Sequence, residues 1–178
     1  MASINIQDLL NKTNKTKPIN TRTASINESK LNLDLESQVL EAEENEIDNT
    51  NISLIEDLVI NLLQARLILH ICHLRVNGPG SFAKHLALGE AYELSSDFAD
   101  KIAETTQGNS KSLLNLSKKF TIEVPAIGNE CEYMDQLLST ITQAIPTLDQ
   151  GGDLICSNIL QDLAGSLRQI IYKLTFLE

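Results

Sequence analysis

The fold of this chain is decided by residues 70–104, HICHLRVNGPGSFAKHLALGEAYELSSDFADKIAE. This stretch contains all three histidines of the chain and, at residues 77–80, the break Asn-Gly-Pro-Gly. Such a break ends a helix, because glycine adopts the left-handed conformation of a helix end and proline cannot continue the hydrogen bonding. We therefore expect a helix that ends near residue 76 and a second one from Ser81 to about Gln107, with Gly108 as its C-cap. The two helices should form a hairpin.

Outward from the hairpin, the first helix should begin near Ser53, because Ser53 and Glu56 have the spacing of a capping box. Apolar residues surround this helix at residues 58–74, which predicts deep burial. Its polar residues are too many for a membrane span, and we expect no membrane association.

Downstream of the hairpin, residues 109–128 read as a long connection, with a short helix at 111–120 and an extended segment at 121–125. A third helix should cover residues 129–145 and end at Pro146. A fourth should follow Gly151-Gly152, with Asp153 as its N-cap. This last helix has apolar residues at alternating spacings of three and four, which is typical of bundle packing. They are Leu160, Leu163, Leu167, Ile170, Leu174 and Leu177.

The sequence thus predicts an all-α fold, and the long connection after the second helix is the arrangement of a ferritin-like four-helix bundle. We expect residues 51–178 to form the bundle. Residues 1–50 should form an extended tail, since they are polar, aperiodic and split into a basic and an acidic half. The net charge of −10 argues against a wholly nucleic-acid-binding surface. The cysteines Cys72, Cys131 and Cys156 have no paired spacing and are expected to be reduced core residues.

Histidines and acids in the decisive stretch suggest a metal site, because imidazole and carboxylate are ligands for iron and zinc. His73 and His85 should lie near the turn of the hairpin, whereas Asp100 and Glu104 share one face of the second helix. Fifteen residues from His85 to Asp100 correspond to roughly 22 Å along a helix, too far for one ion. If these four residues share a metal, a two-fold partner must supply the acids, and the protein is at least a dimer.

The segments ICHLRVNGPGSFAKH and LALGEAYELSSDFADKIAETTQG resemble the helical hairpin of Dps, the starvation-type mini-ferritins. The C-terminal SNILQDLAGSLRQIIYKLTFLE, with HICH and KHLALGEAYE, is similar to the Dps-like proteins encoded by large tailed phages. The resemblance covers about residues 54–178. It implies a di-iron ferroxidase site shared between two subunits, with His73, His85, Asp100 and Glu104 as ligands.

One family ligand is missing. The family has an Asp one turn after its second histidine, where this chain has Gly89. Two weaker candidates could compensate: His70, one turn before His73, and Glu90. For His70, a packed or capped histidine is the favoured alternative. For the four principal residues, the alternative is an inherited set now satisfied by hydrogen bonds at a helix interface.

Two functions follow as hypotheses. The first is a Dps-like oligomer that binds iron between subunits and oxidises Fe(II) in the cytoplasm of a bacterial host. The second is a non-enzymatic structural protein of a phage virion, which keeps the bundle and binds neighbouring subunits or other virion proteins through residues 1–50. The basic residues between Lys12 and Arg22 could also contact DNA phosphates, although the adjacent acidic run weakens that reading.

Overall fold

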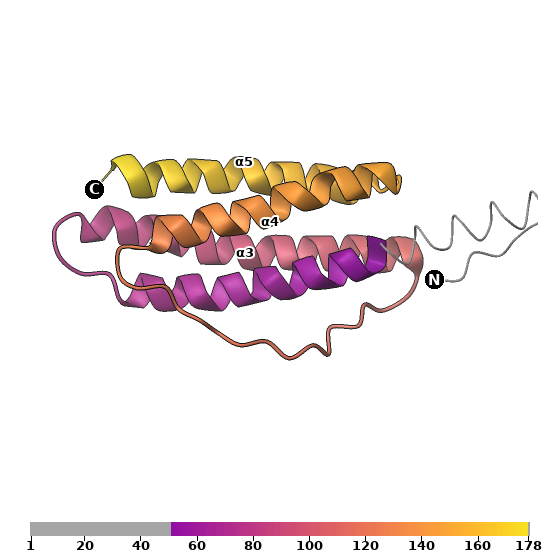
Figure 1. The fold of residues 1–178 in the computed structure, drawn as a ribbon, viewed down its shortest axis with the longest axis horizontal. Helices are drawn as coiled ribbons and strands as arrows, with labels where there is room; N and C mark the ends of the chain where they lie inside the picture. The colour runs from indigo at the N-terminus through magenta and orange to yellow at the C-terminus, as the bar shows by residue number, and fades with distance from the viewer. Residues whose placement is uncertain (1–50, 178) are drawn as a thin grey trace, which may run out of the picture. The chain divides into compact units, whose positions relative to one another are not determined.

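The computed structural model describes residues 51–177, and within this range it consists of four helices and no strand (Figure 1). The first described helix, here called helix 51–74, is followed by α3 (Ser81–Ser110), α4 (Glu130–Gln150) and α5 (Leu154–Phe176). The prediction of an all-α four-helix architecture is confirmed. The predicted tail, residues 1–50, lies outside the described residues.

The four helices are joined by two short turns and one long connector. Helix 51–74 and α3 form the predicted antiparallel hairpin, and the connector, residues 111–129, then returns along helix 51–74 (Figure 1). As a result α4 runs parallel to α3, and α5 packs in the opposite direction against both α3 and α4. The long return predicted after the second helix is therefore present.

The connector has no regular secondary structure at residues 113–126, so the short helix predicted at 111–120 is wrong. Its backbone is instead held by side chains of helix 51–74 and by Arg75 directly after it, which supply the hydrogen bonds that a helix would have supplied internally. Glu56 Oε1 accepts from the Asn115 amide at 2.7 Å, Gln64 Nε2 donates to the Thr121 carbonyl at 3.4 Å, and Arg75 Nη2 donates to the Pro125 carbonyl at 3.2 Å.

The core runs through all four helices, and the predicted seam of α5 lies in it. Leu160, Leu163, Leu167 and Ile170 are fully buried, and Leu174 is nearly so. Leu177 is 50% exposed, because α5 ends at Phe176 and its apolar face stops there. Helix 51–74 is deeply buried, as expected; its core residues are Ile55, Leu58, Val59, Ile60, Leu62, Ala65, Ile68, Leu69 and Cys72.

Several predicted helix ends need correction. Residue 51 is already helical, so Ser53 is not an N-cap, and α3 continues past Gly108 to Ser110. The C-cap of α3 is therefore Lys111, in the left-handed conformation (φ 54°), and not Gly108. In contrast, Asp153 is the predicted N-cap of α5, and its side chain accepts a hydrogen bond from the Cys156 amide at 3.0 Å.

Pro146 does not end the third helix; it lies inside α4, which continues to Gln150. A proline there removes one hydrogen bond to the preceding turn. The buried residues Ala144 and Leu148 stand on either side of it, so apolar packing favours continuation of the helix across the proline.

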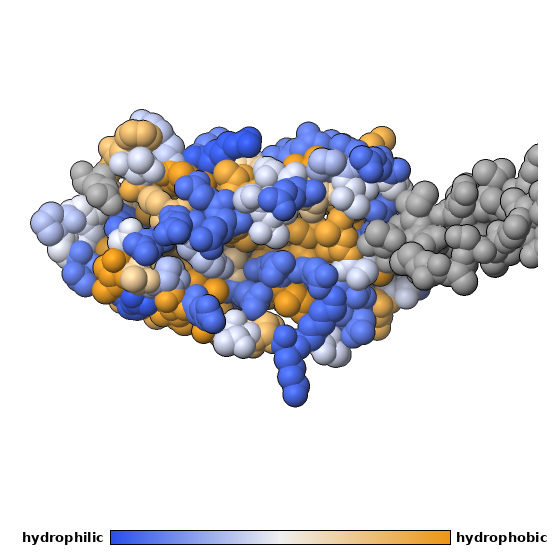
Figure 2. Space-filling model, in the orientation of Figure 1, coloured by the Kyte–Doolittle hydropathy of each residue, from blue (hydrophilic) through white to orange (hydrophobic). Residues whose placement is uncertain are grey.

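The surface carries large apolar side chains among polar ones (Figure 2). Phe82 and Leu86 of α3 are 74% and 56% exposed. The buried face of α3 is lined instead mainly by small residues, among them Ala87, Ala91 and Ala99, so the helix packs closely without them. No helix in residues 51–177 is long and apolar enough to span a membrane.

Candidate functional site

The candidate site lies at the turn of the hairpin between helix 51–74 and α3. His73 is in the last turn of helix 51–74, and His85 is in the second turn of α3. Gly78 and Gly80 have φ angles of 87° and 72°, a conformation that side chains with a Cβ rarely adopt. These two glycines reverse the chain within six residues, and so the two histidines come together as the sequence predicted.

The rings of His73 and His85 stack on each other. Their centroids are 3.6 Å apart and the planes are inclined by 27°. Each ring also bonds to the backbone of the other residue: His73 Nδ1 lies 2.9 Å from the His85 carbonyl oxygen, and His85 Nδ1 lies 3.2 Å from the His73 carbonyl oxygen. The pair is therefore locked in a reciprocal arrangement across the hairpin.

This arrangement assigns the ring hydrogens. A carbonyl oxygen only accepts a hydrogen bond, so each Nδ1 must donate one. In the neutral ring the lone pair then resides on Nε2. A backbone carbonyl bonded to one imidazole nitrogen is the usual partner that orients a metal-binding histidine. Both histidines can thus offer Nε2 as a ligand while Nδ1 stays bonded.

His70 and Tyr92 extend this group of rings. The His70 ring centroid lies 4.5 Å from that of Tyr92 and 6.0 Å from that of His73, and Tyr92 meets His73 edge-on at 5.3 Å. His70 therefore packs among rings, one helical turn before His73. We refer to His70, His73, His85 and Tyr92 as the histidine cluster.

Gly89 faces the histidine cluster. A Cβ built on Gly89 would lie 3.5 Å from Cε1 and Nδ1 of His73, an ordinary van der Waals distance. The position at which the sequence lacks an acid is thus directly beside one of the two candidate ligands, with room for a Cβ atom.

The candidate carboxylates are elsewhere. Asp100 and Glu104 are both exposed on α3, further along the helix from His85. Glu90, the weaker candidate, forms an ion pair with Lys173 of α5. Within residues 51–177 no three His, Cys, Asp or Glu side chains are close enough to hold a metal ion. One chain therefore brings together His73 and His85 but not the acids, in agreement with the distance expected from the sequence.

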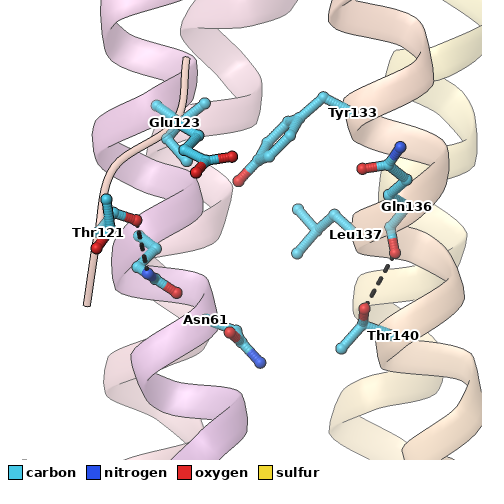
Figure 3. A pocket seen from close by; sticks show the side chains of 9 residues that line it. Asn61, Thr121, Glu123, Tyr133, Gln136, Leu137 and Thr140 are labelled. Atoms are coloured by element: carbon cyan, nitrogen blue, oxygen red, sulfur yellow. Dashed lines mark hydrogen bonds between the residues drawn. The ribbon is translucent and has the colours of Figure 1, made fainter. Parts of the chain in front are cut away.

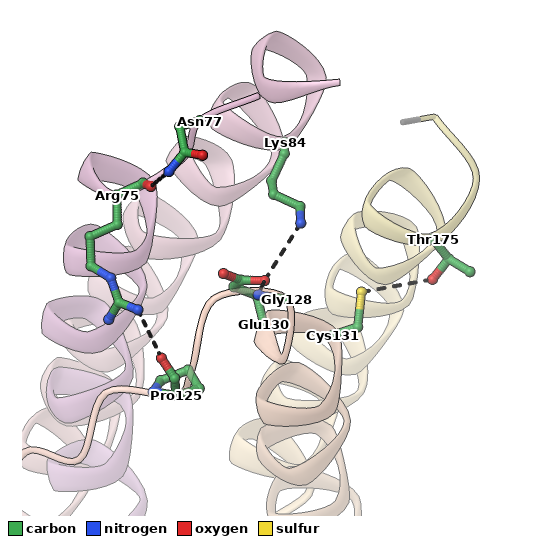
Figure 4. A network of polar contacts seen from close by, with 8 residues as sticks. All are labelled: Arg75, Asn77, Lys84, Pro125, Gly128, Glu130, Cys131 and Thr175. Atoms are coloured by element: carbon green, nitrogen blue, oxygen red, sulfur yellow. Dashed lines mark hydrogen bonds and ion pairs between the residues drawn. The ribbon is translucent and has the colours of Figure 1, made fainter. Parts of the chain in front are cut away.

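Glu130, which the sequence reasoning missed, links the hairpin to α4. Glu130 is only 5% exposed. Its Oε2 accepts a hydrogen bond from the Gly128 amide at 2.9 Å and lies 3.6 Å from Lys84 Nζ, with which it forms an ion pair (Figure 4). Lys84 is adjacent to His85, so this contact fixes the first turns of α3 against the start of α4. An acid in the first turn of a helix was the only sequence signal for it.

The described residues define an all-α protein with a four-helix bundle and a histidine cluster at one helical turn. Residues 73–174, more than half of the chain, match a family described as a family of unknown function (DUF5856), and the chain belongs to that family. No curated protein and no solved structure matches it.

Proposed function

We propose that the chain is a Dps-like, ferritin-like protein that self-associates, at least as a two-fold dimer, and binds iron at sites shared between subunits. In each site His73 and His85 of one copy would provide neutral nitrogen ligands, and Asp100 and Glu104 of another copy would provide carboxylates. The observation that carries the proposal is the reciprocal hydrogen bonding of the two histidines, which leaves both Nε2 atoms as lone-pair donors.

Two further observations support a shared site. Asp100 and Glu104 are exposed and separated by one helical turn, so they are open to a second subunit. The exposed Phe82 and Leu86 lie on the same helix as the acids and offer apolar surface that a partner subunit could bury. Iron bound there would be the substrate of Fe(II) oxidation, and an oligomer of this kind would act in the cytoplasm of a bacterial host.

A complementation experiment tests the shared site. One variant carries His73→Ala and His85→Ala, and the other carries Asp100→Ala and Glu104→Ala. Neither variant alone should bind iron at this site. A purified heterodimer of the two should regain one of the two sites, because that site then combines the intact histidines of one copy with the intact acids of the other. Anaerobic Fe(II) titration gives the stoichiometry, and aerobic oxidation gives the activity. No binding by the unchanged protein, or no recovery in the heterodimer, would refute the proposal.

The second candidate is a structural protein of a phage virion that keeps the bundle without the chemistry. It is favoured by Gly89, which leaves no acid beside His73, and by Glu90, which is paired with Lys173. The hydrogen bonds of the stacked histidines are also satisfied without metal. In this case residues 1–50 would bind neighbouring subunits or other virion proteins, and DNA contact through the basic residues Lys12–Arg22 is a subsidiary possibility.

Two variants separate the candidates. Deletion of residues 1–50 should abolish assembly but leave the helical circular-dichroism spectrum intact if the protein is structural; normal assembly would count against that role. Gly89→Asp should raise iron affinity at least tenfold if only one ligand is missing, with Gly89→Asn as the control of equal size. Equal iron affinity in the Asp and Asn variants would disfavour a metal site at the histidine cluster.

A further inference from the structure

The bundle also has a groove between the connector, helix 51–74 and α4 (Figure 3). None of the residues that line it belongs to the proposed iron site. One cavity of about 340 Å³ is lined by Asn61, Glu123, Tyr133 and Thr140, among others. A neighbouring cavity of about 260 Å³ shares Glu123, Tyr133 and Gln136 with it and adds Glu132. Because the lining residues are shared, the two cavities form one groove, here called the α4 groove.

The α4 groove is elongated. Its lining follows α4 from Asn129, just before the helix, to Thr140. Eleven residues of helix correspond to about 16 Å. The opposite wall is the connector, which Gln64 and Arg75 hold through the Thr121 and Pro125 carbonyls. The groove thus has a preformed shape suited to a linear ligand rather than a round one.

The lining is rich in hydrogen-bond acceptors and contains no cation. Glu123 and Glu132 are exposed and make no ion pair within residues 51–177, and no Lys, Arg or His lines either cavity. Tyr133 points its hydroxyl across the groove toward the Glu123 carboxylate (Figure 3). Burial raises the pKa of Tyr133 to about 12, so the phenol is neutral at physiological pH and adds no charge.

The floor of the groove is apolar. Ile68 and Leu137 are 5% and 7% exposed, and Val124 and Pro125 line the second cavity. Amide and hydroxyl oxygens of Asn61, Gln136 and Thr140 lie around this floor. Carboxylates and neutral acceptors bind ammonium groups, which only donate hydrogen bonds, and an apolar floor binds the methylene chain between them. A compact inorganic cation would use the oxygens but leave the floor empty.

We propose that the α4 groove binds a linear aliphatic polyamine, with its ammonium groups on Glu123 and Glu132 and its methylene chain along Ile68 and Leu137. Tyr133 is a specificity residue, since its hydroxyl oxygen accepts from an ammonium group between the two carboxylates. This site shares no residue with the histidine cluster or with Asp100 and Glu104, and its occupation does not depend on iron.

Calorimetric titration of the full chain with spermidine tests the site. Glu123→Gln with Glu132→Gln should weaken binding at least tenfold, and Tyr133→Phe about threefold. The matched control is Glu93→Gln with Asp162→Asn, which removes the same charge from exposed positions outside the groove and should weaken binding less than twofold. The uncharged 1,8-octanediol and Mg²⁺ should each bind at least tenfold more weakly than spermidine.

Limited proteolysis tests whether spermidine binds in the α4 groove. Spermidine should slow trypsin cleavage after Lys118 and Lys119, because a ligand in the groove ties the connector to α4. The slowing should persist in the control variant and disappear in the Glu123→Gln, Glu132→Gln variant, whose folding is checked by its circular-dichroism melt. Equal weakening in the groove and control variants, an absence of saturable spermidine binding, or equal affinity for Mg²⁺ would overturn the proposal.

Discussion

His73 and His85 each donate a ring hydrogen to the other's backbone carbonyl, and their rings stack at a centroid distance of 3.6 Å. Each histidine therefore contacts both the ring and the backbone of the other. It closes the hairpin at the turn where helix 51–74 ends. The stability of the hairpin and the orientation of the candidate ligands thus depend on the same two residues.

This reciprocity predicts coupling between the two histidines. His73→Ala and His85→Ala should each lower the free energy of unfolding by about 1 kcal/mol, because each removes one hydrogen bond and the stack. The double variant should cost less than the sum by about 0.5 kcal/mol, because the stack can be lost only once, whereas the second substitution still removes a hydrogen bond of its own. Urea denaturation of the four proteins measures the cycle, and strict additivity would show that the pair is not coupled.

Two glycines should respond in opposite directions to alanine. Gly89 lies inside α3 with ordinary space for a Cβ, so Gly89→Ala should raise the free energy of unfolding by about 0.5–1 kcal/mol. A Cβ on Gly151 would collide with Asn51 Nδ2, which donates to the Gly151 carbonyl. Gly151→Ala should therefore lower that free energy by about 1 kcal/mol. Thermal melts compare the two; a stabilising Gly151→Ala would contradict the contact.

The N-cap of α5 should contribute measurably to the free energy of unfolding. Asp153→Ala removes the acceptor of the Cys156 amide and should lower the free energy of unfolding by about 1 kcal/mol. Asp153→Asn keeps a side-chain oxygen and should lie close to the unchanged protein. If chemical denaturation gives the same loss for both substitutions, the cap hydrogen bond does not account for it.

Alkaline pH should destabilise the bundle through two buried groups. Burial raises the pKa of Tyr133 from 10.0 to about 12 and that of the Cys156 thiol from 9.0 to about 11. As pH rises, the unfolded chain therefore releases these protons before the folded chain does. The contribution of the two groups to the free energy of unfolding is complete below pH 9 and is lost as pH rises toward 12. Stability against urea should fall less steeply in Cys156→Ala between pH 9 and 11, and in Tyr133→Phe between pH 10 and 12. Unchanged slopes would contradict this assignment.

The three thiols should differ in reactivity. Cys72 and Cys156 are 2% and 1% exposed, and burial raises the pKa of both, which disfavours the reactive thiolate. Cys131 is only partly buried. A thiol reagent should therefore modify one cysteine of the native protein quickly and all three after denaturation. Cys131→Ser should remove the fast phase, and a fast phase that survives it would show that a core thiol is accessible.

The sequence predicted most of the helices because their signals are local or periodic. The glycines at residues 78 and 80 marked the hairpin turn, Asp153 marked a helix start, and the spacing of the leucines in α5 identified its buried face. Each of these depends on a few neighbouring residues, and the structure confirms them.

The errors occurred where tertiary contacts outweigh local preference. Pro146 has a local tendency to end a helix, but buried residues on both sides of it favour continuation. Residues 111–120 have helical composition, yet helix 51–74 already supplies partners for the connector backbone. The proximity of His73 and His85 followed from the turn, whereas their exchange of hydrogen bonds with each other's carbonyls depends on how closely the two backbones approach, which spacing does not specify.

The way in which the connector is attached affects how the family can vary. Three of its attachments run from side chains of helix 51–74 and its turn to main-chain atoms of the connector. Every amino acid supplies a carbonyl, and all but proline supply an amide hydrogen. Evolution can therefore replace residues 115, 121 and 125 with little loss of attachment, whereas Glu56, Gln64 and Arg75 cannot be exchanged so freely. Related chains should accordingly diverge in the connector and preserve the helix residues that hold it.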